Sequence, residues 1–363
     1  MSLWKVVVSS GLVLVLVLHF STLPTKAGPG KASKDQEFKY KLDPSWPKNQ
    51  SIFTGQVYCV GVDDKNGDIY VGQRGTDGQP VIVFGTTGEL KRVFKNDSSP
   101  ISKIHGMRMH YNETDKSSRI WLTDLGDDLS GHTVKRFSPT GKLELVLGTP
   151  NQAGTALKPN YQFDQVADLA ISDNGEVYVV DGDGGVNNRL LKLDKDFHLK
   201  WHIGSIGNSS SQFHIPHSVE LDSFGRVWVA DRMNGRIQAF DVDNGTFLGQ
   251  WTSCFQDGQP YSVRLSADKS HFVVAQLNQD KILLVEAPQK SGDIGDCNVK
   301  GQIEVTKGSK PHLVAVSQSE GTIYAAELGS HTCQKFVPVN AGCMLYCNQL
   351  ILSSGMIALM VNW

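Results

Sequence analysis

The sequence has almost no net charge and contains no paired C-x₂-C motifs. Its 35 basic and 37 acidic residues leave a formal net charge of −2 over 363 residues, so it lacks the basic surface expected of a nucleic-acid-binding protein. A RING domain holds its zinc ions with such paired cysteines, and the six cysteines of this chain do not provide them. We therefore expect neither a nucleic-acid partner nor a RING domain. What is present, 40% hydrophobic and 20% charged residues, allows a buried core.

The first 27 residues have the composition of a secretory signal peptide. Lys5 precedes an apolar run from Val6 to Phe20, and Thr25-Lys26-Ala27 offers small residues of the kind a signal peptidase recognises. The alternative is a membrane anchor, but the run is shorter than the roughly 20 apolar residues that span a bilayer. We predict removal of residues 1–27, a flexible polar leader over 28–36, and no stable membrane span in the mature protein. The expected location is extracellular, or the lumen of secretory granules and lysosome-like organelles.

A unit of about 40 residues recurs along most of the chain. Its clearest copy, Phe213–Trp251, has four runs of alternating apolar and polar residues, separated by turns containing Gly, Asn and Asp. This pattern is typical of consecutive β-hairpins. Six copies of four strands predict an all-β fold, a six-bladed β-propeller. The other five copies are Gly55–Phe94, His105–Gly148, Asp168–Gly204, Tyr261–Glu286 and Pro311–Phe336.

The last copy contains only about three strands. The strand-like segment EFKYKL, within Glu37–Trp46, is predicted to supply the missing one and to close the ring, leaving no open sheet edge. The propeller is thus expected over residues 37–340. The tail, residues 341–363, is apolar and uncharged. It is compatible with a weak membrane anchor, with a lipid-anchor signal that lacks the usual polar spacer, or with an alternative splice end.

Candidate modification sites agree with a secretory route. Five N-x-S/T sequons lie in polar, turn-like stretches, where a glycan would be solvated. In an oxidising compartment some cysteines should pair, and Cys254 and Cys297, which flank one repeat, are the preferred pair. Cys59 lies in a predicted strand and is expected to be buried. The predicted glycosylation sites are Asn49, Asn96, Asn112, Asn208 and Asn244.

Histidine occupies the same position in every second repeat. His105, His217 and His312 stand at the start of the innermost strand of repeats 2, 4 and 6, where repeats 1, 3 and 5 have Tyr58, Ala167 and Tyr261. Alternate blades are related by approximate three-fold rotation about the central channel, so three imidazoles should converge on one axial point. Three protein ligands with a fourth position free are typical of a catalytic zinc site. Seven other histidines are expected to be ordinary surface or core residues: His110, His132, His198, His202, His214, His271 and His331.

The segment PHSVELDSFGRVWVADRMNGRIQAF resembles an NHL repeat, and the resemblance covers roughly Gly55–Phe336. The chain is also similar to the lyase domain of peptidylglycine α-amidating monooxygenase, a secretory six-bladed propeller of this type. In that domain the zinc-binding histidines lie in motifs that match those around His105, His217 and His312. The resemblance further implies that Arg74, in QRGTDG, and Arg232, in ADRMNGR, hold a substrate carboxylate by bidentate hydrogen bonds.

Two positions depart from the lyase. Its proposed catalytic tyrosine aligns with Asp183, a shorter residue with a far lower reference pKa, which would have to take over the catalytic role after burial. An acidic residue of the lyase's calcium site is replaced by Leu313. The remaining calcium ligands would be backbone carbonyls near Val57 and Met107. Zinc is therefore the expected cofactor, with calcium as a further candidate.

Two functions from different classes fit the sequence. The first is a secreted binding or scaffold protein for a protein or peptide ligand, with a metal in its central channel, since fold alone does not set function. The second is a zinc-dependent lyase or hydrolase that acts on small carboxylate-bearing substrates and resembles peptidyl-α-hydroxyglycine α-amidating lyase. The missing tyrosine weakens the second. A third, ubiquitin transfer or RNA binding as in other NHL proteins, conflicts with the charge and the cysteine pattern.

Overall fold

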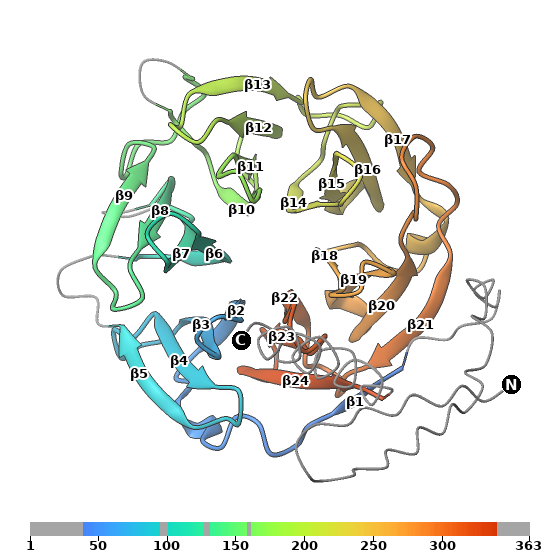
Figure 1. The fold of residues 1–363 in the computed structure, drawn as a ribbon. Coiled ribbons are helices and arrows are strands. Elements are labelled where there is room, and N and C mark those ends of the chain that lie inside the picture. Colours follow the sequence, from blue (N-terminus) through green and yellow to red (C-terminus); the bar gives the residue numbers. More distant parts are fainter. Residues whose placement is uncertain (1–38, 95–100, 127–130, 158–160, 340–363) are drawn as a thin grey trace, which may run out of the picture. The chain divides into compact units, whose positions relative to one another are not determined.

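Six four-stranded antiparallel sheets form a ring around a central channel (Figure 1). The computed structural model describes residues 39–94, 101–126, 131–157 and 161–339. The predicted six-bladed all-β propeller is confirmed, and the described blades run from Tyr40 to Pro338. The predicted signal peptide, the leader, Asn96, Cys343, Cys347 and the apolar tail lie outside the described residues.

In blades 1 to 5 the strands run in chain order from the channel to the rim, and in blade 6 the N-terminal strand β1 is the outermost one. Blade 1 contains β2 (Gln56–Asp63), β3 (Asp68–Arg74), β4 (Val81–Gly85) and β5 (Leu90–Phe94). Blade 2 contains β6 (Ile104–Asn112), β7 (Ser117–Asp124), β8 (Thr133–Phe137) and β9 (Leu143–Leu147). Blade 3 contains β10 (Val166–Ile171), β11 (Val177–Asp181), β12 (Arg189–Leu193) and β13 (Leu199–Ile203).

The second half of the ring repeats this order. Blade 4 contains β14 (Pro216–Leu221), β15 (Arg226–Asp231), β16 (Arg236–Asp241) and β17 (Phe247–Trp251). Blade 5 contains β18 (Ser262–Leu265), β19 (His271–Gln276), β20 (Lys281–Glu286) and β21 (Val299–Glu304). Blade 6 contains β22 (Pro311–Val316), β23 (Ile323–Glu327), β24 (Thr332–Pro338) and the N-terminal β1 (Tyr40–Leu42). Within the described residues the helical elements are four 3₁₀ turns: η1 (Gln50–Ile52), η2 (Arg232–Asn234), η3 (Ser253–Phe255) and η4 (Leu277–Gln279).

Local sequence explains the tight hairpins. Between β14 and β15, Gly225 adopts a φ of +75°, a conformation that other residues rarely adopt. Asp222 Oδ1 accepts hydrogen bonds from the backbone N–H of Phe224 at 2.8 Å and of Arg226 at 3.1 Å. Such an Asp side chain stabilises a turn by bonding backbone groups that follow it. The predicted Ser-Phe-Gly turn is thus confirmed together with its physical cause.

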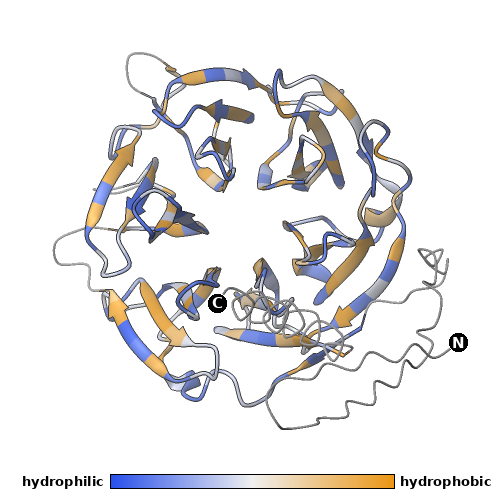
Figure 2. Ribbon diagram, in the orientation of Figure 1, coloured by the Kyte–Doolittle hydropathy of each residue, from blue (hydrophilic) through white to orange (hydrophobic). Residues whose placement is uncertain are grey.

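Burial changes from the middle of each blade to its rim. Every residue of β15 is buried, whereas β17 alternates and buries only Trp251 fully. The middle strand is covered by neighbouring blades on both faces, so it loses the polar alternation of a half-exposed strand. Figure 2 shows alternating polar and apolar bands along the outermost strands of the ring.

The core consists of six clusters, one at each junction between neighbouring blades. The junction of blades 4 and 5 is the most aromatic, with Trp228, Trp251 and Phe272 in contact at ring-centroid distances of 4.5–5.9 Å. Aromatic pairs in this range are worth about 0.5–1.5 kcal/mol beyond their buried area. The hydrophobic core is thus divided among the junctions between blades, and each blade is stabilised by packing against its two neighbours.

The ring closes as predicted. β1 pairs antiparallel with β24, with Tyr40 opposite Pro338 and Leu42 opposite Phe336. Trp46, which follows β1, is buried and donates its indole N–H to the Gly85 carbonyl of blade 1 at 3.0 Å. One short N-terminal segment therefore completes blade 6 and contacts blade 1.

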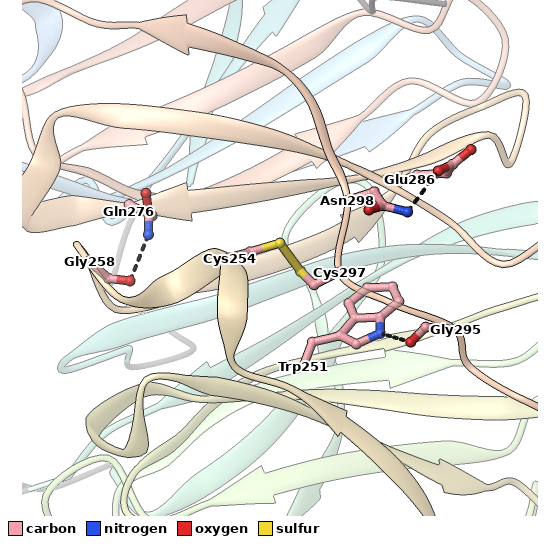
Figure 3. Close-up of a disulfide and its surroundings, with 8 residues drawn as sticks. All are labelled: Trp251, Cys254, Gly258, Gln276, Glu286, Gly295, Cys297 and Asn298. Atoms are coloured by element: carbon pink, nitrogen blue, oxygen red, sulfur yellow. Dashed lines mark hydrogen bonds between the residues drawn. A yellow bond between two sulfur atoms is a disulfide. The ribbon is translucent and has the colours of Figure 1, made fainter. Parts of the chain in front are cut away.

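The predicted disulfide between Cys254 and Cys297 is present (Figure 3). It joins η3 to the segment before β21, and Trp251 nearby donates its indole N–H to the Gly295 carbonyl at 2.8 Å. Cys59 is buried and unpaired, as expected, and Cys333 is also a free buried thiol. Among the described residues, no helix has the length and hydropathy needed to cross a membrane.

Candidate metal centre on the propeller axis

The three predicted histidines meet on the propeller axis. His105 on β6, His217 on β14 and His312 on β22 are all buried, with relative exposures of 1%, 0% and 3%. Their ring centroids are 4.7–4.9 Å apart, and one nitrogen of each lies within 4.8 Å of the others. The convergence expected from the repeat register is therefore confirmed.

Each imidazole is oriented by a backbone carbonyl of the next blade. Nδ1 of His105 lies 2.7 Å from the carbonyl oxygen of Ala167, that of His217 lies 2.6 Å from Tyr261, and that of His312 lies 2.8 Å from Tyr58. A carbonyl only accepts hydrogen bonds, so each Nδ1 carries the hydrogen. The neutral ring then has its lone pair on Nε2, the tautomer that binds metal.

The electrostatic environment of His217 and His312 favours their neutral imidazoles. Burial lowers the pKa of His217 to about 3, against an opposing effect of the Asp183 charge. Burial, followed by the neighbouring His105 and His217, holds the pKa of His312 well below its usual range. In addition, Nε2 of His217 is buried and has no hydrogen-bond partner among the described residues. Burying a nitrogen without a hydrogen-bond partner costs free energy, and a metal ion bound to the nitrogen would remove this cost. The three histidines therefore fit a metal ion.

Asp183 lies at the histidine cluster. Its Oδ2 is 3.0 Å from Nε2 of His105, and its Oδ1 is 3.4 Å from Nη1 of Arg232. Burial alone would raise its pKa, but the charge and hydrogen bond of His105, with His217 and Arg232, hold the pKa well below its usual range. A carboxylate in this state is a poor proton acceptor, which disfavours the catalytic base role considered from sequence.

Both candidate arginines flank the cluster, each over a tyrosine. The guanidinium of Arg74 lies 3.5 Å from the ring centroid of Tyr58, and that of Arg232 lies 4.9 Å from that of Tyr261. Arg74 donates its Nε to the Ile104 carbonyl at 2.9 Å, while its buried Nη2 has no partner among the described residues. Buried Nε of Arg232 is likewise unpartnered within the part of the chain that the structure describes.

The role of Tyr58 and Tyr261 was not predicted from the sequence. Tyr58 and Tyr261 occupy the same strand position as the histidines, in blades 1 and 5, and their rings lie 5.3 and 6.1 Å from that of His312. They hold the arginines through cation–π contacts. Their shared register with the histidines is the signal that could have identified them.

The residues at the predicted calcium position do not fit that ion. Leu313 is buried in an apolar cluster with Cys59 and Met107, and Val57 is fully buried in the next cluster. Ca²⁺ prefers several oxygen ligands, including carboxylates, and this chain has leucine where the carboxylate would stand. Calcium has no part in the function that we propose below.

Further along the innermost strands of blades 2 to 5, two ion pairs cross the channel and form a charged belt. Arg264 lies 2.9 Å from Asp168, and Arg108 lies 3.0 Å from Glu220. The first pair is almost completely buried. Beyond the belt, all six inner strands line a cavity of about 430 Å³ that includes Glu220 and Arg264. The belt thus separates the histidine cluster from the opposite mouth of the channel.

Three of the predicted glycosylation sites are exposed, namely Asn49, Asn208 and Asn244, and Asn112 is half-buried. Asn112 Oδ1 accepts the backbone N–H of Thr114 at 2.8 Å. Their accessibility permits a glycan, but glycosylation itself stays a prediction.

The blades and the axial cluster define a class: six-bladed β-propellers with three histidines from alternate blades at one end of the channel. Comparison with known proteins identifies the family of the chain. The sequence is 44% identical over 308 residues to NHL repeat-containing protein 3 of Homo sapiens, which covers 85% of this chain and 87% of that protein. The chain belongs to the family of NHL repeat-containing protein 3.

More distant similarities extend to a lyase and to a second propeller. Peptidyl-alpha-hydroxyglycine alpha-amidating lyase 1 of Drosophila melanogaster is 29% identical over 250 residues, covering 61% of this chain and 43% of that protein. A solved structure described as a streptogramin B lyase superposes with a TM-score of 0.52 at 15% identity, covering 84% of this chain and 89% of that one. At that identity the likeness concerns the fold alone. No protein-family model matches the sequence.

Proposed function

We propose that this chain is a zinc-binding propeller of the secretory pathway that binds a carboxylate-bearing peptide or protein at the metal end of its channel. The observation that carries the proposal is the set of three imidazoles whose Nδ1–H groups are held by carbonyls, which leaves three Nε2 atoms to face one point. His105, His217 and His312 would hold the ion.

Metal analysis of the purified mature chain tests the metal. We expect one zinc per chain, and we expect His217→Ala to lose it, because two imidazoles bind zinc far more weakly than three. His198→Ala is the matched control, since His198 is exposed and should leave the zinc content unchanged. A wild-type chain that binds no divalent metal would overturn the proposal.

The arginines support an anionic ligand. Arg74 and Arg232 each have a buried N–H beside the cluster with no partner among the residues that the structure describes, and a carboxylate would accept from such groups. On the same face, Val186, Ile206 and Met233 are exposed apolar side chains, which would contact the rest of a peptide. We expect peptides with a free carboxylate to bind more tightly than their amides, and Arg74→Met to remove that preference. Equal affinities for acid and amide would contradict this.

The secretory location rests on the signal-peptide pattern, the sequons and a disulfide that reducing compartments disfavour. Expression in cultured cells tests it. The protein should appear in the medium or in a secretory organelle, and glycosidase treatment should increase its gel mobility. A cytosolic, glycosidase-insensitive product would exclude it.

A lyase activity is the second candidate, favoured by the amidating-lyase relative and by the retained histidines and arginines. The presence of Asp183, where the lyase has its proposed catalytic tyrosine, argues against this activity. Turnover of a peptidyl-α-hydroxyglycine by the zinc-loaded chain decides between the two. We expect none, and we expect Asp183→Tyr to be the variant in which turnover would first become measurable.

A further inference from the structure

We propose that Asp183 is the fourth protein ligand of the axial metal, so that the site is a closed three-histidine, one-carboxylate site. This inference rests on the proposed function, because it concerns the same metal. Sites with four protein ligands are typical of structural zinc, whereas catalytic zinc keeps one position for water or substrate. The proposal therefore assigns the ion a role in holding the channel end together.

The carboxylate is placed where a ligand atom would be. Oδ2 of Asp183 lies 3.0 Å from Nε2 of His105, and neighbouring ligand atoms around a tetrahedral zinc ion are about 3.3 Å apart. Since Nδ1 of His105 carries a hydrogen, a neutral ring presents a lone pair from Nε2 to the carboxylate. Two lone pairs at this distance repel unless a proton or a cation lies between them. A divalent cation would displace such a proton to solvent and satisfy both atoms.

The backbone around Asp183 is fixed independently of any ion. The N–H groups of Gly182 and Asp183 both donate to the carbonyl of Gln165, at 3.0 and 2.8 Å. Gly182 has a φ of +144°, and a Cβ there would lie 1.8 Å from the Asn187 carbonyl oxygen. The Asp183 side chain is only 12% exposed. The loop therefore directs a carboxylate into the channel instead of leaving it in solvent.

Arg232 completes the arrangement as a positioning residue. Its Nη1 lies 3.4 Å from Oδ1 of Asp183, so the arginine holds one carboxylate oxygen while the other faces the histidines. Ligating carboxylates usually have such outer partners, and losing one typically weakens metal binding 10–100-fold. Tyr261, under the guanidinium, fixes its position in turn.

Cobalt substitution tests the inference, because the visible spectrum of bound Co²⁺ reports the number and kind of its ligands. The full mature chain is loaded with Co²⁺ and titrated with azide, a small anion that binds where a metal has a free or water-filled position. We expect the wild-type spectrum not to change with azide. In Asp183→Ala we expect azide to shift the spectrum, and zinc to bind at least about tenfold more weakly than in the wild type.

Two further variants separate the roles. Asp196→Ala, which removes an exposed aspartate of blade 3, should behave as the wild type. Arg232→Met should weaken zinc binding and still exclude azide, because the carboxylate stays. Azide binding to the wild type as tight as to Asp183→Ala would overturn the inference while leaving the three-histidine site in place. Failure of the wild type to bind any cobalt or zinc would instead overturn the proposed function. Unfolding curves establish that each variant folds.

Discussion

At the scale of single residues, the ion pair of Arg264 and Asp168 shows how the inner strands use buried charge. The two side chains lie 2.9 Å apart with exposures of 2% and 0%. Arg264 also donates to the hydroxyl of Ser218 at 2.7 Å and to the Val263 carbonyl at 2.8 Å. Burial lowers the pKa of Arg264, although Asp168 opposes this shift. The pair joins blade 3 to blade 5 across the channel.

We predict that Arg264→Met destabilises the protein by about 3–5 kcal/mol, because it leaves Asp168 as an uncompensated buried charge. Chemical denaturation measures this loss. The double variant Arg264→Met/Asp168→Asn, which removes the charge as well, should be more stable than the single variant. Lys195→Met, which breaks an exposed ion pair with Asp196, is the control and should leave the midpoint of the denaturation curve unchanged. A single variant as stable as this control would contradict the prediction.

At the scale of elements, the strand that closes the ring contacts a buried histidine. The hydroxyl of Tyr40 on β1 lies 3.1 Å from Nε2 of His271 on β19. Burial lowers the pKa of His271 to about 4, and the nearby Asp268 opposes this shift. The folded state therefore holds His271 neutral where the unfolded chain would already be protonated, since the reference pKa is about 6.5. The contribution of neutral His271 to the free energy of unfolding is fully present above pH 6.5 and is lost as the pH falls toward 4.

We predict that the stability of the wild type falls by up to about 3 kcal/mol more than that of His271→Gln between pH 7 and pH 4. Glutamine keeps a polar side chain near Tyr40 but does not titrate. The measurement is the free energy of unfolding at several pH values, with the exposed His198→Gln as control. Parallel curves for the wild type and His271→Gln would show that His271 does not cause the acid sensitivity.

The disulfide acts on one blade. It links residues 43 positions apart and encloses β18, β19 and β20 of blade 5. A loop of this length restricts the unfolded chain by about 4 kcal/mol in the chain-entropy treatment. We predict that the double variant Cys254→Ser/Cys297→Ser is less stable by about this amount. Reductant should destabilise the wild type and leave the double variant unchanged, and equal stability of the two proteins would contradict the prediction.

At the scale of the whole molecule, the proposed metal joins parts of the ring that are otherwise far apart in sequence. Its histidines come from blades 2, 4 and 6, which are not neighbours in the ring. Binding to the folded ring but not to the unfolded chain should stabilise it by mass action.

We predict that zinc at 100 times its dissociation constant raises the free energy of unfolding by about 2.7 kcal/mol. For a ring of this size the corresponding shift in Tm is roughly 5 °C. Thermal unfolding with zinc and with a chelator measures it. His217→Ala should show no such dependence, and a zinc effect of equal size in that variant would mean that the ion stabilises the protein from another site.

Several features could be predicted from the amino-acid sequence alone: the repeat, the number of blades, the closing strand, the disulfide and the register of the three histidines. These features follow from local periodicity, from turn residues such as Gly225, and from the rule that equivalent positions in successive blades lie at equal distance from the axis. The residues that surround the three histidines could be identified only from the tertiary structure. The approach of Asp183 to His105 depends on a loop conformation that no periodicity encodes. The pairing of Arg264 with Asp168 depends on side chains that meet across the channel from blades almost 100 residues apart.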